Sequence, residues 1–132
     1  MAHILIVDDE RDVVSLLKFL LEKDGHRVDT AGNGAQALEK LGVEPENAKL
    51  PIPDLMIIDV MMPVMDGYTA CERLGKAPRT RSMPVLVLTA KGDMRDVCAQ
   101  VPNVGAYIEK PFEPKKLREL IAGMLPPTKP HA

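Results

Sequence analysis

The sequence contains only two cysteines, Cys71 and Cys98, and no tryptophan. Two cysteines are too few for a disulfide scaffold, so we expect reduced thiols and a cytoplasmic location. No apolar stretch approaches the roughly 20 residues that a membrane-spanning helix requires. The first residues do not resemble a signal peptide, because a short apolar run is followed at once by two aspartates. These absences exclude the secreted and membrane classes of protein.

An excess of charge of either sign is also missing. Lysine and arginine number 17 against 19 aspartates and glutamates, which gives a formal net charge of -2. Non-specific binding to nucleic acid or to a membrane surface needs an excess of basic side chains, so we expect neither partner. The 132 residues, 45% of them hydrophobic and 27% charged, suffice for one globular domain that folds without a structural metal.

Short apolar runs alternate with helical patterns along the chain. Three runs are continuously apolar, as expected of strands buried on both faces of a parallel sheet; they cover residues 4–7, 55–58 and 85–88. Weaker strand candidates cover residues 27–31 and 106–109. The sequence therefore predicts five strands.

Helical periodicity lies between these runs. Apolar residues follow the i, i+3, i+4, i+7 spacing of one helical face from Val13 to Leu21 and again from Leu117 to Leu125, with Pro114 suited to begin the second helix. Weaker helices are predicted at 34–41 and 67–76, and one at 94–100 by position alone. The order, βα repeated five times, predicts an α/β fold with a doubly wound, five-stranded parallel sheet flanked by five helices.

Two proline-containing stretches interrupt this pattern. Residues 42–53 include three prolines and form a segment too long for a typical connection from a helix to a strand. Residues 126–132 also hold three prolines and are interpreted as a tail or the start of a linker. We therefore expect one domain over residues 1–125.

Polar side chains follow the predicted strands where each one ends. They are Asp8 and Asp9, Asp59, Thr89 and Lys110. In an open parallel sheet, ligands bind beyond the carboxyl ends of the strands, so these side chains are expected to share one crevice. Three carboxylates brought together repel one another unless a cation enters, and Mg²⁺ is the hard cation that prefers oxygen ligands.

The expected crevice has the composition of a phosphoryl-transfer site. Lys110 adds a second positive charge, and Thr89 adds a hydroxyl that can hydrogen-bond to a phosphoryl oxygen. Asp59 is the natural nucleophile, since it alone ends the central strand. The residues themselves thus predict Mg²⁺-dependent phosphoryl transfer to Asp59.

The same motifs resemble the receiver domain of two-component response regulators. They are the segments 4–10, 59–63, 65–67, 88–90 and 110–112, in an order that spans residues 4 to about 125. Each motif alone is weak, but five in this order are specific. The resemblance implies a flavodoxin-like fold with strand order 2-1-3-4-5.

The resemblance also implies roles for individual residues. Asp59 would accept a phosphoryl group from a phosphohistidine, with Thr89 and Lys110 on the phosphoryl oxygens. Mg²⁺ would be held by the side chains of Asp9 and Asp59 and by the backbone carbonyl of Met61, and Asp8 would assist.

Two further features are implied near the last predicted strand. Tyr107 stands at the family's aromatic switch position, which moves inward when Thr89 is drawn toward the phosphoryl group. The bond between Lys110 and Pro111 would be cis. The sequence departs from the family over residues 97–107, just before Tyr107, so we expect the preceding helix, on the face by which the family signals, to be short, shifted or mobile.

As for partners, the resemblance implies a histidine kinase or a histidine phosphotransfer protein, an unidentified downstream protein and a possible phosphorylation-dependent homodimer. Such a domain catalyses only its own phosphorylation and dephosphorylation, so we do not expect an enzyme. The alternative is a pseudo-receiver, an interaction module that acts without phosphorylation.

A glycine-rich segment offers a third, enzymatic possibility. Residues 32–37 fit the dinucleotide pattern G-x-G-x-x-G/A between a strand and a helix. The preceding strand is polar, however, and Asp54 begins a strand where the ribose-binding acid should end one. A glycine-rich turn that caps a helix is therefore the preferred interpretation.

Overall fold

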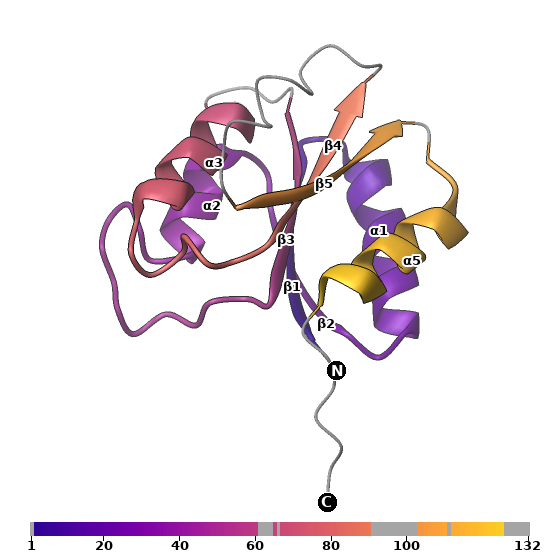
Figure 1. The fold of residues 1–132 in the computed structure, drawn as a ribbon, viewed down its shortest axis with the longest axis horizontal. Helices are drawn as coiled ribbons and strands as arrows, with labels where there is room; N and C mark the ends of the chain where they lie inside the picture. The colour runs from indigo at the N-terminus through magenta and orange to yellow at the C-terminus, as the bar shows by residue number, and fades with distance from the viewer. Residues whose placement is uncertain (1, 61–64, 66, 91–102, 111, 126–132) are drawn as a thin grey trace, which may run out of the picture.

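The computed structural model of the chain describes residues 2–60, 65, 67–90, 103–110 and 112–125. Strands and helices alternate through this part of the chain (Figure 1). The strands are β1 His3–Val7, β2 Arg27–Ala31, β3 Leu55–Asp59, β4 Val85–Ala90 and β5 Val104–Lys110. The helices in the described residues are α1 Arg11–Lys23, α2 Gly34–Lys40, α3 Gly67–Lys76 and α5 Pro114–Met124.

The five strands form one sheet in the order β2-β1-β3-β4-β5, and every neighbouring pair is parallel. This confirms the predicted doubly wound, flavodoxin-like α/β fold. The order places β3 at the centre of the sheet between β1 and β4. All five carboxyl ends therefore lie along one edge, which is where the polar residues predicted from the sequence follow their strands.

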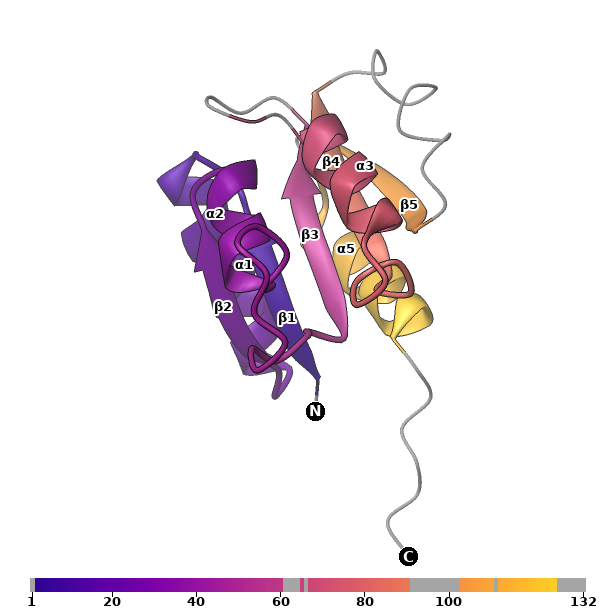
Figure 2. The ribbon, with the colours of Figure 1, turned by 90° about the vertical axis from the view of Figure 1, so that its left-hand side faces the viewer.

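Helices cover both faces of the sheet (Figures 1 and 2). On one face, α2 and α3 pack on alternate strand residues through side chains such as Leu38 and Leu74, both buried. On the other face, α1 and α5 pack through Leu17, Leu21, Leu117 and Ile121. The central strands are buried on both sides, which explains why their sequences are continuously apolar rather than alternating.

The predicted elements match the observed ones within a few residues. The largest difference is in the last strand, which begins at Val104 instead of residue 106 and runs to Lys110. The predicted helix at 94–100 and the tail at 126–132 lie outside the described residues. In the described part of the chain, no helix has the length and apolar character needed to cross a bilayer.

The glycine-rich segment before α2 is a helix cap. The side chain of Asn33 accepts a hydrogen bond from the backbone N–H of Gln36 at 2.9 Å, and the side chain of Gln36 accepts one from the N–H of Gly32 at 2.8 Å. This reciprocal pair satisfies one open donor of the first helical turn, the Gln36 N–H, and the N–H of the residue that precedes the N-cap Asn33. The structure therefore supports the capping interpretation of residues 32–37 over the dinucleotide pattern.

A bulge lies in β5 just before Tyr107. Val85 pairs with Val104 and Leu86 with Ala106, so Gly105 is the extra residue on β5. Glycine inside a strand often marks such a bulge. The bulge sets the register in which Tyr107 lies opposite Val87 on the neighbouring strand.

Candidate functional site

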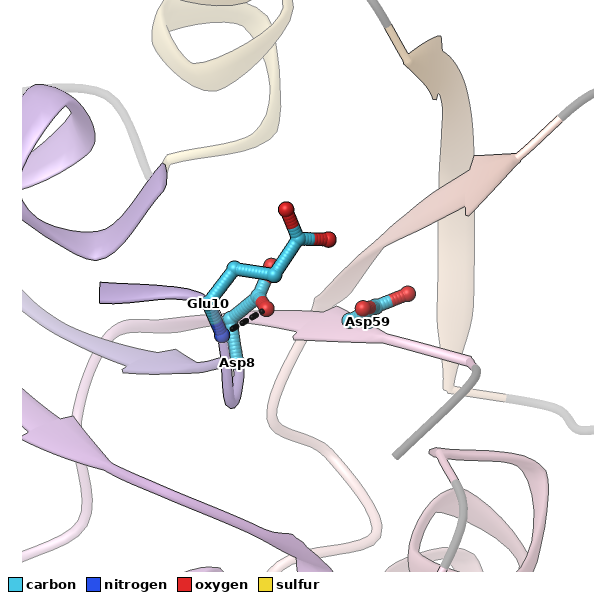
Figure 3. A group of neighbouring side chains, drawn as sticks. All are labelled: Asp8, Glu10 and Asp59. Atoms are coloured by element: carbon cyan, nitrogen blue, oxygen red, sulfur yellow. Dashed lines mark hydrogen bonds between the residues drawn. The ribbon is translucent and has the colours of Figure 1, made fainter. Parts of the chain in front are cut away.

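The carboxyl ends of the central strands bring together the polar residues named from the sequence. Asp8 directly follows β1, Asp59 is the last residue of β3, and Lys110 is the last residue of β5. Figure 3 shows Asp8 and Glu10 on the turn after β1, beside Asp59. Strand order accounts for the meeting of Asp8 and Asp59, because β1 and β3 are neighbours and all the strands run in one direction. Lys110 reaches them from β5 across the end of β4.

Lys110 connects the acidic residues of this cluster. Its Nζ lies 3.0 Å from Asp8 Oδ2, 3.1 Å from Asp59 Oδ2 and 3.1 Å from Glu10 Oε1. The Lys110 side chain is 16% exposed, whereas those of Asp8 and Asp59 are 0% and 5% exposed. Charges this deeply buried require compensation, and the ammonium group supplies one positive charge to three carboxylates.

The pKa shifts follow from this packing. Burial raises the pKa of Asp8, and a hydrogen bond from the Glu10 N–H to Asp8 Oδ1 at 2.9 Å opposes that rise. For Lys110, burial favours the neutral amine, but hydrogen bonds to Asp8, Asp59 and Glu10 outweigh burial and raise its pKa. The lysine therefore stays protonated at neutral pH.

The carboxylates could also hold a metal ion. One oxygen from each of Asp8, Glu10 and Asp59 lies within 4.8 Å of the others, and this is a donor set of hard oxygens. Asp9, expected as a ligand, is exposed and is not part of this group. Met61, whose carbonyl was also expected as a ligand, lies outside the described residues.

Sequence reasoning did not select Glu10 as a site residue. Glu10 is the N-cap residue of α1, yet its side chain makes no capping hydrogen bond and contacts Lys110 instead. The signal available in the sequence was its place in an unbroken run of three acids after β1. The conformation of the turn decides which of these three acidic side chains points toward Asp59.

Thr89 lies near the end of β4, next to the residue that pairs with Asp59. Its side chain is buried, with 1% of the residue exposed. Its Oγ1 has no hydrogen-bond partner among the described residues. Buried hydroxyls are normally hydrogen-bonded, so this one is available to a group that enters the site.

Gly67 belongs to the motif at residues 65–67, and the structure shows why a glycine stands there. A Cβ at this position would lie 2.3 Å from the backbone oxygen of Asp59, and the Gly67 N–H donates to the Val60 carbonyl at 2.8 Å. The start of α3 thus packs directly against the backbone of Asp59. Only a residue without a side chain fits here without a backbone shift.

The remaining predicted residues are Asp9, Tyr107 and Pro111. A recess of 370 Å³ beside Asp8 is lined in part by Asp9, Arg11 and Thr30. Tyr107 is partly buried against the core on the face covered by α2 and α3. Pro111 lies outside the described residues, so the conformation of its peptide bond stays a prediction.

Comparison with known proteins agrees with this geometry. The family model for the response regulator receiver domain matches residues 4–122. The alkaline phosphatase synthesis transcriptional regulatory protein PhoP of Bacillus subtilis is 37% identical over 124 residues, which cover 92% of this chain and 48% of that protein. The chain thus spans about half the length of this relative.

Solved structures share the fold over nearly the whole chain. The signal receiver domain of a signal transduction histidine kinase from Syntrophus aciditrophicus is 34% identical with a TM-score of 0.83, over 100% of this chain and 96% of that one. The response regulator protein TrrA from Thermotoga maritima, in complex with Mg(2+)-BeF, is 32% identical with a TM-score of 0.78, over 95% of this chain and 100% of that one. Because the family model and these relatives match across the acidic cluster and the sheet that carries it, this chain belongs to the response regulator receiver domain family of two-component systems.

Proposed function

We propose that this receiver domain accepts a phosphoryl group on Asp59 from a phosphohistidine. The observation that carries the proposal is the position of Lys110 Nζ, 3.1 Å from Asp59 and 3.0 Å from Asp8, at the end of the central strands. Phosphoryl transfer depends on positioning and on neutralisation of charge, and this site provides a carboxylate with a fixed cation beside it.

In the proposed reaction, a carboxylate oxygen of Asp59 forms a bond to phosphorus as the bond from phosphorus to the imidazole nitrogen of the donor breaks. The products are an acyl phosphate on Asp59 and a free histidine on the donor, whose nitrogen keeps the electron pair. Lys110 balances the negative charge gained at Asp59. The buried Thr89 hydroxyl donates a hydrogen bond to a phosphoryl oxygen, which gives it the partner that it lacks among the described residues.

The acidic cluster fits Mg²⁺, because hard carboxylate oxygens from Asp8, Glu10 and Asp59 lie within 4.8 Å of one another. The complex of the Thermotoga relative with Mg(2+)-BeF supports the choice of cation. Bound there, Mg²⁺ would offset charge on the phosphoryl oxygens. Asp9 lies at the edge of the same turn and is the additional ligand that the family resemblance implies.

The proposed partners are a histidine kinase or histidine phosphotransfer protein as donor and a downstream protein that contacts the phosphorylated form. A homodimer of the phosphorylated form is a further proposal. The expectation that nucleic acid plays no part is not supported, because the Bacillus relative is named a transcriptional regulatory protein. The domain acts as a signalling switch that modifies itself, and a pseudo-receiver finds no support in the family match or in the intact acidic cluster.

The test is the intact mass of the protein after incubation with Mg²⁺ and acetyl phosphate. We expect one phosphoryl adduct on the wild type, no adduct without Mg²⁺ and none on Asp59→Asn. An adduct on Asp59→Asn equal to that on the wild type would place the acceptor elsewhere. No adduct at all, together with no Mg²⁺ binding by calorimetry, would contradict the proposal and favour the pseudo-receiver.

A further inference from the structure

The long segment between α2 and β3, residues 41–54, is shaped by contacts of its own. Gly42 has a φ of +71°, a conformation that favours glycine, and its carbonyl accepts a hydrogen bond from the Asn47 N–H at 2.9 Å. Val43 and Glu46 form an isolated antiparallel bridge within the resulting turn. Long connections of this kind are uncommon in compact domains and often serve binding.

Arg79, in the connection after α3, holds this segment in place. Its Nε donates to the Leu41 carbonyl at 3.0 Å and one terminal nitrogen donates to the Ala48 carbonyl at 3.2 Å. The other terminal nitrogen donates to the Leu50 carbonyl. One half-buried guanidinium thus fixes three points of the segment. A surface formed by the segment is therefore pre-organised.

A pocket of about 550 Å³ lies between this segment and the end of α3. That volume is in the usual range for small-molecule sites, roughly 300–1,000 Å³. Apolar side chains, among them Val43, Ala77 and Pro78, contribute to its lining, and Lys76 and Arg79 add positive charge. The segments that line the pocket, residues 42–48 and the end of α3, lie toward the side of the sheet where the strands begin, away from the carboxyl ends that carry the acidic cluster (Figure 1).

The charges around the pocket are unbalanced. Arg73 is paired with Glu44 at 2.7 Å, so these two charges offset each other. Arg79 donates only to neutral carbonyls, which leaves its positive charge without a counterion among the described residues. Lys76 has no hydrogen-bond or ion-pair partner in that part of the chain either. Glu46 is the opposing carboxylate, so the rim keeps a net positive charge.

We call this cavity the α3 pocket, and we propose that it binds a small organic anion. The apolar body of the anion contacts Val43 and Ala77, and its carboxylate or phosphate contacts Lys76. The apolar lining accounts for the body of the ligand and the unpaired ammonium accounts for its charge. The site is independent of the proposed phosphorylation of Asp59.

The test compares three probes that share one apolar body and differ in charge: 4-phenylbutyrate, 4-phenylbutanol and 4-phenylbutylamine. Each is titrated into the ¹⁵N-labelled full chain while amide chemical shifts are recorded. We expect 4-phenylbutyrate to shift the amides of residues 42–48 and 73–79 saturably, and to bind more tightly than the alcohol or the amine. Lys76→Gln should weaken binding of the carboxylate about fivefold, as loss of an exposed ion pair does.

Matched variants show whether binding depends on the charge of Lys76 in the α3 pocket. Lys115→Gln removes an exposed lysine of α5 on the other face of the sheet, and Asp59→Asn removes the proposed phosphoacceptor; both should bind 4-phenylbutyrate as the wild type does. Shifts centred on the exposed Leu16 and Phe19 of α1 would overturn the proposal. So would tighter binding of the amine, equal effects of Lys76→Gln and Lys115→Gln, or the absence of saturable shifts.

Discussion

Lys110 Nζ lies 3.1 Å from Asp59 Oδ2, although 51 positions separate the two residues in the sequence. The contact joins the last residue of β5 to the last residue of β3, across the end of β4. In this arrangement the ammonium is the cation that compensates the buried carboxylates. A metal ion that enters the cluster must therefore share those carboxylates with Lys110.

Removal of the Lys110 charge should strengthen Mg²⁺ binding. In Lys110→Met the carboxylates of Asp8 and Asp59 lose their compensating charge, so we expect Mg²⁺ to bind about tenfold more tightly, which corresponds to about 1.4 kcal/mol. Calorimetric titration with Mg²⁺ measures this. Lys116→Met, which removes an exposed lysine of α5, should bind Mg²⁺ as the wild type does. Weaker binding to Lys110→Met would show that the lysine supports the metal.

Thr89→Val should slow phosphorylation without lowering the stability of the protein. The Oγ1 of Thr89 is buried without a partner among the described residues, so its replacement by a methyl group should leave the free energy of unfolding unchanged or raise it by up to about 1 kcal/mol. Phosphorylation by acetyl phosphate should slow, because a donor to the phosphoryl group is lost. Urea denaturation and intact-mass kinetics measure the two effects.

Thr80→Val is the matched control for that variant. Thr80 is also fully buried, but its Oγ1 donates to the Leu74 carbonyl at 2.7 Å. Valine at this position leaves a buried carbonyl without its partner, so we expect a loss of about 1–2 kcal/mol in the free energy of unfolding. Equal stability changes in Thr89→Val and Thr80→Val would contradict the interpretation of Thr89.

Gly67→Ala should displace the backbone of the proposed phosphoacceptor, Asp59. A Cβ there would lie 2.3 Å from the Asp59 carbonyl oxygen, so the start of α3 or the end of β3 must move. We expect a loss of about 1–3 kcal/mol in stability, as for other overpacked sites, and slower phosphorylation. Gly123→Ala, in α5 with no atom within 4 Å of the added Cβ, should instead stabilise the protein by up to about 1 kcal/mol.

Arg79→Gln should release the segment that forms the α3 pocket. Arg79 donates to the carbonyls of Leu41, Ala48 and Leu50, and hydrogen bonds from a charged, half-buried group contribute about 1–2 kcal/mol to stability. We expect that loss in urea denaturation, and faster amide hydrogen exchange in residues 41–50. Arg81→Gln is the control, because Arg81 is exposed and has no side-chain partner among the described residues.

The ion pair between Asp24 and Arg118 should make the stability of the protein depend on pH in the acidic range. Arg118 Nε donates to Asp24 Oδ2 at 2.7 Å, and this hydrogen bond lowers the pKa of Asp24 below its usual 3.8. A carboxylate with a lowered folded-state pKa stabilises the protein above its unfolded pKa and ceases to do so as the pH falls through the folded pKa. Asp24→Asn should therefore lower the melting temperature at neutral pH.

That difference from the wild type should begin to shrink as the pH falls below about 4, where Asp24 of the unfolded chain becomes protonated, and should vanish below the lowered pKa of folded Asp24. Thermal melts across this range measure it. Glu119→Gln, at an exposed position of α5 without an ion pair among the described residues, should show no such pH-dependent difference. A difference between Asp24→Asn and the wild type that persists in acid would show that the pair acts through packing rather than charge.

Much of this molecule is determined by its sequence alone. Continuous apolar runs identify β1, β3 and β4, because a strand covered by helices on both faces has no polar side. A parallel sheet then aligns the carboxyl ends of its strands. The convergence of Asp8, Asp59 and Lys110 follows from their positions at those ends.

Other features were decided only by tertiary structure. Glu10, and not Asp9, faces Lys110, because the directions of successive side chains in a turn depend on what packs around it. Likewise, no local pattern shows that Arg79 reaches back to residues 41–50, since its partners are backbone carbonyls, which every residue has. Hydrophobic periodicity reports which face of an element is buried, whereas contacts between distant loops arise only after the elements have packed.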